Sequence, residues 1–155
     1  MRIPGFKKGS LFRLVSELGH DFVNKFDSFK DFCNWANLAP NNKITGGKLI
    51  SSKVPKRKNP VGQILRVAAN SLKNEKPALG IYFRKTQARK GYNAAIVDTA
   101  NKMGRIIYTM VKNQTEYDET LGQEKHMEIL KKRIKRTQKE LDKLQKLISG
   151  CENAA

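Results

Sequence analysis

The chain has 155 residues and a formal net charge of +17, from 31 Lys and Arg against 14 Asp and Glu. Hydrophobic residues make up 39% of it, which is enough to form a core and excludes a fully disordered chain. With only two cysteines, the chain cannot form a disulfide framework or a Cys-rich zinc site. The two histidines are far apart and lack the spacing of metal ligands. The longest uncharged stretch, 32–42, is too short to span a bilayer, and no apolar signal segment begins the chain. We therefore expect a cytoplasmic protein with no membrane partner and no metal site.

Positive charge is concentrated in the middle of the chain. Residues 41–112 contain sixteen basic residues and only two acids, Glu75 and Asp98, whereas the segments on either side are nearly balanced. A basic surface that serves only solubility normally mixes both signs. A membrane-surface helix is disfavoured, because the charge extends over several elements. The pattern predicts nucleic acid as the partner, and with it a nucleoid-associated location in the cytoplasm.

The first forty residues predict two short helices. A Pro-Gly turn at 3–6 precedes apolar residues at helical spacing over 11–18, which resembles half of a helix-hairpin-helix whose backbone amides hold phosphate. Ser28 and Asp31 form a capping box in front of an apolar stripe that includes Cys33. We expect Cys33 to lie in the core.

Residues 37–59 have no helical periodicity and predict an irregular or hairpin-containing basic loop. Gly46-Gly47 lies between two short runs suited to strands, which is typical of a tight hairpin turn. The loop contains no acid and six cations, Lys43, Lys48, Lys53, Lys56, Arg57 and Lys58. On composition alone an exposed loop without function is the simpler interpretation, although long irregular loops often carry function.

Three further helices are predicted after the loop. Asn59 and Pro60 supply a cap and a first-turn proline for the first, Pro77 starts the second, and Asn93 caps a third that ends near Asn113. The candidate nucleic-acid-binding residues on these helices are Arg66, Arg84, Lys85, Arg89 and Lys90. The helix dipole also explains cations at a helix C-terminus, which is their alternative role.

The last segment predicts a coiled-coil-like helix. Its seam residues alternate in steps of three and four: Met127, Leu130, Ile134, Thr137, Leu141, Leu144 and Ile148. The seam either joins another chain through 127–148 or packs back onto the globular part. We expect a mainly α protein with a small helical nucleic-acid-binding domain at 1–115, and a linker and basic helix with a frayed tail at 116–155.

The loop segment LAPNNKITGGK, residues 38–48, resembles the carboxy-terminal transposase domain of the DEDD-type insertion-sequence transposases. This family includes bridge-RNA-guided recombinases and pilin-gene invertases. The resemblance starts near residues 3–5, extends through Lys112, and takes in 29–35, 65–69, 82–84, 88–91 and 106–108. It implies a domain that acts with guide RNA beside an RNase H-like domain, whose four acidic residues bind divalent metal.

The resemblance also implies that a loop serine attacks DNA and forms a covalent phosphoserine link. Family members generally have Ser-Gly there, and this chain has Thr45-Gly46. The methyl group of Thr45 stiffens χ1 and crowds attack on phosphorus, so hairpin structure is its alternative role. Ser51 and Ser52 are fallback hydroxyls. Because the sequence begins at the Pro-Gly turn and has no four clustered acids, we expect a truncated form. Divalent metal (Mg) would bind only when the missing RNase H-like domain is present, and the chain alone would be inactive.

Three functions remain open from the sequence. The first is the DNA-binding domain of an insertion-sequence transposase or recombinase acting in DNA transposition. The second is a non-catalytic DNA- or RNA-binding protein that uses the same cations. The third is an interaction protein that associates through 127–148 with a second copy of itself or with full-length transposase.

Overall fold

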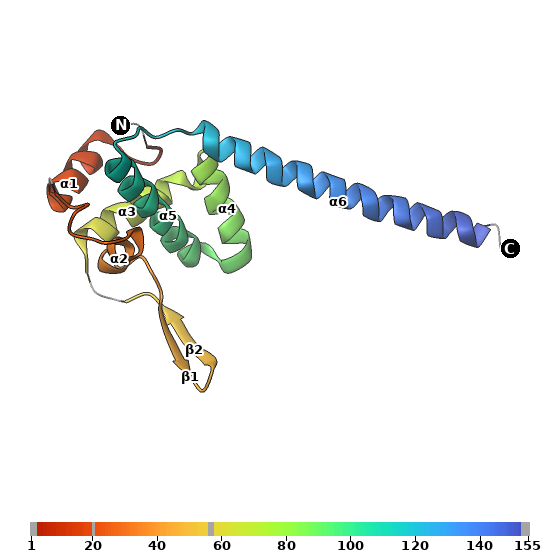
Figure 1. Cartoon of the computed structure of the whole chain (residues 1–155), viewed down its shortest axis with the longest axis horizontal. Helices are drawn as coiled ribbons and strands as arrows, with labels where there is room; N and C mark the ends of the chain where they lie inside the picture. Colours follow the sequence, from red (N-terminus) through yellow and green to blue (C-terminus); the bar gives the residue numbers. More distant parts are fainter. Residues whose placement is uncertain (1–2, 20, 56–57, 153–155) are drawn as a thin grey trace. The chain divides into compact units, whose positions relative to one another are not determined.

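The computed structural model describes residues 3–19, 21–55 and 58–152 of the chain, which forms two compact units, 1–117 and 118–155. The elements in chain order (Figure 1) are α1 (Lys8–Leu18), α2 (Phe29–Trp35), β1 (Asn41–Thr45), β2 (Lys48–Lys53), α3 (Pro60–Ser71), the 3-10 helix η1 (Leu72–Asn74), α4 (Ala78–Lys90), α5 (Tyr92–Asn113) and α6 (Thr120–Glu152). One two-stranded sheet accompanies the described helices. The predicted mainly α fold is confirmed.

The core of the first unit lies around α5. This helix packs against α2, α3 and α4, while α1 packs against α3. Phe32, Leu65 and Met103 are completely buried there, from α2, α3 and α5 in turn. Burying one such side chain contributes about 1.5–3 kcal/mol, so these contacts hold the short helices together.

Two helix starts follow the sequence prediction. The Ser28 hydroxyl accepts the Asp31 N–H at the start of α2, and the Asn59 side chain accepts the Gly62 N–H at 3.1 Å at the start of α3. Both caps satisfy backbone donors that have no partner within the helix. The predicted caps at Ser28 and Asn59 are confirmed.

The predicted cap at Asn93 is wrong. Helix α5 begins at Tyr92, one residue before Asn93, so Asn93 lies inside its first turn. Gly91 takes the capping position with φ of 88°, a conformation that favours glycine. Its N–H donates to the Gln87 carbonyl at 2.9 Å, and its carbonyl accepts the Ala95 N–H at 3.1 Å. One glycine therefore ends α4 and starts α5.

The N-terminal Pro-Gly turn packs against α3. A Cβ at Gly5 would lie 2.7 Å from the Ala68 carbonyl oxygen, and the Ser71 hydroxyl donates to the Gly5 carbonyl at 3.2 Å. Helix α3 also lies against the end of α2, since a Cβ at Gly62 would lie 2.0 Å from the Ala36 carbonyl oxygen. These close approaches fix α3 as the support for both neighbours.

The predicted hairpin is confirmed. Strands β1 and β2 pair antiparallel around Gly46 and Gly47, whose φ values of 56° and 75° suit a two-residue turn that glycine adopts readily. Ile44 faces Leu49 and Lys43 faces Ser51, so Ile50 is an extra residue that forms a β-bulge.

The second unit consists mainly of α6, a continuous helix of 33 residues. Its seam residues Met127, Ile134, Leu141 and Leu144 are each more than half exposed, and Leu130 is half-buried. The side chain of the predicted seam residue Ile148 lies outside the described part. Among the described residues, no helix is both long enough and apolar enough to cross a membrane.

Candidate nucleic-acid interface

The strand register divides the hairpin into two different faces. Antiparallel partners share a face and successive residues alternate between faces. The cationic hairpin face consists of Asn41, Lys43, Thr45, Lys48, Ser51 and Lys53. Ile44 and Leu49 lie on the other face together with Asn42 and Ser52. All three strand lysines are therefore on the same side as Thr45.

The cationic hairpin face is open to solvent. Every residue from Asn41 to Lys53 is exposed except Ser51, which is half-buried. Its three lysines form no ion pair with any residue that the structure describes. Lys53 lies level with Asn41 and Lys48 lies level with Thr45, so the three lysines are level with positions 41, 43 and 45 of β1. They therefore extend over about 13 Å along the hairpin. Such a row of cations suits consecutive phosphates of a nucleic-acid backbone.

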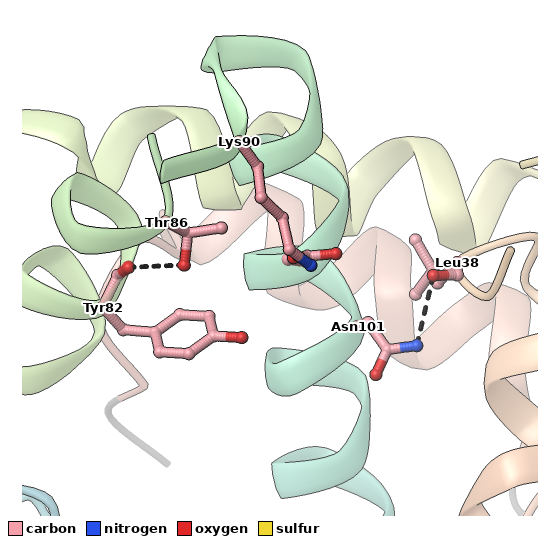
Figure 2. A network of polar contacts seen from close by, with 6 residues as sticks. Leu38, Tyr82, Thr86, Lys90 and Asn101 are labelled. Carbon is pink, nitrogen blue, oxygen red and sulfur yellow. Dashed lines mark hydrogen bonds and ion pairs between the residues drawn. The ribbon is translucent and has the colours of Figure 1, made fainter. Parts of the chain in front are cut away.

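Side chains of the helical core anchor the segment that leads into β1. Asn59 donates to the Trp35 carbonyl at 2.9 Å, Arg66 donates to the Asn37 carbonyl, and Asn101 donates to the Leu38 carbonyl at 3.1 Å. Figure 2 shows Asn101 reaching from α5 to Leu38. Asn37 has a left-handed φ of 54°, which turns the chain out of α2. The hairpin therefore starts from a point held by α3, its cap and α5.

Arg66, Arg84 and Lys90, three of the predicted helix cations, each have a defined partner within the fold. Arg66 is partly buried, and this burial lowers the pKa of its guanidinium. Arg84 donates to the carbonyls of Lys73 and Glu75, at 3.1 and 2.7 Å. Lys90 pairs with Asp98 at 2.6 Å. These contacts give the three side chains structural roles, and their nucleic-acid role stays a prediction.

The other predicted cations differ in how far the structure describes them. Lys85 and Arg89 are exposed on α4, and Lys58 is exposed before α3. Lys56 and Arg57 lie outside the described residues. Helix α4 packs against α5 and η1, whereas the hairpin strands pack on each other. The structure thus brings together Lys43, Lys48 and Lys53, and leaves the α4 cations as a separate group.

Sequence reasoning missed three polar residues of α5. Asn101 anchors the segment before β1, Lys102 lies 4.1 Å from the centre of the Tyr82 ring, and Arg105 lies 4.3 Å from that of Phe29. No local motif marks these positions. Their roles follow from contacts with residues far away in sequence.

Thr45 has the hydroxyl but not the base that nucleophilic attack requires. It lies at the exposed end of β1 opposite Lys48, and hairpin residues 41–53 include no His, Asp or Glu. The lysines on its face can stabilise negative charge that develops on phosphate oxygens. Ser51 shares this face, while Ser52 is on the opposite face.

The described residues do not fit the divalent metal that the resemblance implies. Within this part of the chain, no group of three or more His, Cys, Asp or Glu side chains could hold a metal ion. Cys33 is buried as predicted, and burial raises the pKa of its thiol to about 11. A neutral thiol in the core is not a nucleophile at physiological pH.

The fold and the hairpin together define a small helical domain that presents a cationic β-hairpin. The chain matches the model of the transposase IS116/IS110/IS902 family over residues 1–82, which is more than half of its length. It therefore belongs to this family, as the loop segment 38–48 predicted, and its role lies in transposition. The matched part includes the hairpin and α3, and α6 lies beyond it. No curated protein and no solved structure matches the chain.

Proposed function

We propose that this domain binds DNA during transposition through the cationic hairpin face. The observation that carries the proposal is the register, which places Lys43, Lys48 and Lys53 on one exposed face without an acid. Phosphate contacts of this kind give affinity without sequence preference and release counterions. A guide RNA offers the same phosphates, so we propose that it competes with DNA for this face.

The salt dependence of DNA binding tests this proposal. In the full chain, Lys43, Lys48 and Lys53 are replaced together by Gln. The slope of log affinity against log salt should fall by about 0.9 for each phosphate that the protein no longer neutralises, which is about 2.7 in total. The matched control replaces three exposed lysines outside the hairpin, Lys7, Lys8 and Lys30, by Gln. This variant should change the slope by less than about 0.9. Equal slopes for the two variants would contradict the proposal.

We further propose that Thr45 is the hydroxyl that attacks phosphorus when a partner supplies the base. The Thr45 oxygen would form a bond to phosphorus, the bond from phosphorus to the departing DNA oxygen would break, and the proton would pass to the partner's base. The support is its place among the lysines of the cationic hairpin face.

The α6 seam supports a proposal of self-association with a second copy of the chain. In an antiparallel pair centred between Lys135 and Arg136, the seam layers match: Leu130 lies across from Leu141, and Ile134 lies across from Thr137. The same register brings Arg133 near Glu140 of the second copy, twice by symmetry. In a parallel pair Arg133 and Glu140 would instead face Gln138 and Gln145. The charges therefore favour the antiparallel arrangement.

A further inference from the structure

A row of cations lies on α6 directly opposite the seam. The α6 basic stripe consists of Lys132, Arg136, Lys139, Lys143 and Lys146, in steps of four and three. Each member follows a seam residue by two positions, which is about 200° around the helix. All five side chains are exposed. The stripe extends over fourteen residue steps, or about 21 Å of helix.

The acids of α6 lie beside this stripe rather than on it. Glu128 pairs with Lys132 at 2.6 Å, with both side chains more than 60% exposed, and such exposed pairs are weak. Asp142 lies beside the stripe, and none of the stripe positions is acidic. Arg136, Lys139 and Lys143 thus form a cationic centre on the helix.

We propose that the α6 basic stripe is a second nucleic-acid contact surface, which binds the phosphate backbone of duplex DNA. The proposal rests on the proposed function only for the class of partner. It does not require the cationic hairpin face to be a contact, because the hairpin and α6 belong to different compact units. The stripe also lies outside the residues that match the transposase family.

The placement of the stripe favours nucleic acid over an anionic membrane. A helix that lies on a membrane buries its apolar face and keeps its cations at the edges of that face, near the headgroups. Here the stripe is opposite the seam, so lipid at the seam would leave the stripe pointing into water. A coiled coil also covers the seam, and the stripe on its outer surface then stays accessible to the phosphates of DNA.

Two pairs of lysines on α6 allow a matched test in the full chain. Lys139 and Lys143 are on the stripe, whereas Lys131 and Lys135 are off it. Both pairs are exposed and four residues apart. Each pair is replaced by Gln, which keeps helix propensity. The stripe variant should lower the salt slope for a 30-base-pair DNA duplex by about 1.8, and the control variant by less than about 0.9.

The outcomes separate this inference from the proposed function. A loss confined to the hairpin triple variant, with no change in the stripe variant, would overturn the stripe and leave the hairpin proposal standing. Equal losses in the two α6 variants would also overturn it, because binding would then follow net charge rather than the face. A third result is that the stripe variant keeps DNA binding and loses binding to vesicles of phosphatidylserine and phosphatidylcholine. That result would overturn the inference and assign the stripe to membranes. Circular dichroism at 222 nm should be the same for both variants.

Discussion

At the scale of single residues, Gly62 sets how closely α2 and α3 approach. An added Cβ would lie 2.0 Å from the Ala36 carbonyl oxygen, so Gly62→Ala must push the two helices apart. We expect a loss of about 1–3 kcal/mol in the free energy of unfolding, typical of overpacking. Urea denaturation followed by Trp35 fluorescence measures it.

Gly9→Ala is the control for Gly62→Ala. A Cβ at this position has no atom within 4 Å, and Gly9 is exposed in α1. Alanine also has the higher helix propensity, so this variant should keep or slightly raise the stability. Equal destabilisation by the two substitutions would show that α2 and α3 have room for a methyl group between them.

Thr45 provides the second prediction at this scale. The chain alone should form no covalent adduct with DNA, since the hairpin has no group to take the proton. With the RNase H-like domain of a related transposase, its guide RNA and Mg, Thr45→Ser should raise adduct formation because the hydroxyl is less crowded. A denaturing gel with labelled DNA detects the shifted band.

The matched variants identify which hydroxyl reacts. Thr45→Ala should abolish the adduct, whereas Ser51→Ala and Ser52→Ala should leave it intact. Ser51 is the stricter control, because it lies on the same face as Thr45. An adduct that survives Thr45→Ala would assign the attack to another residue.

Among the elements, the hairpin has one feature that the sequence predicts, its turn, and one that it does not, the face on which each lysine lies. Gly46-Gly47 between two strand-like runs is sufficient to predict the turn. The face of each lysine is not predictable, because strict alternation puts Lys48 and Lys53, five residues apart, on opposite faces. The bulge at Ile50 restores them to one face. A bulge depends on how the two strands pair, and composition does not determine that pairing.

Helix ends show the same division between local and distant causes. The caps at Ser28 and Asn59 follow from their own sequences, and both are predictable. The prediction fails at Asn93 because Gly91, with a positive φ, both ends α4 and occupies the capping position of α5. The role of Asn101 is not predictable, since its partner Leu38 is 63 residues away in sequence.

At the scale of the whole molecule, the α6 seam leads to a prediction about association. Leu141→Asp places a charge in the seam and should convert a self-associating chain into a monomer. Ile129→Asp is the control, because Ile129 is equally apolar and 59% exposed but lies off the seam. Sedimentation velocity over a range of concentrations compares the two.

Two optical probes extend this test to the two compact units. Trp35, the single tryptophan, reports on the first unit, whereas circular dichroism at 222 nm also reports on α6. A dimer is stabilised by mass action, so the dichroism melt should shift with protein concentration while the fluorescence melt does not. A monomer at all concentrations, for both the parent chain and Leu141→Asp, would contradict self-association.

The corner at Gly91 restricts how the length of this chain can vary. Most connections between helices tolerate an added or deleted residue, because a loop absorbs the change. Here the same residue closes α4 and opens α5, so no loop is present to absorb it. One inserted residue would rotate α5 by about 100° relative to α4 and move Met103 and Ile107 out of the core. Insertions and deletions should therefore be excluded at this corner, and chains related to this one should keep the spacing between α4 and α5 constant.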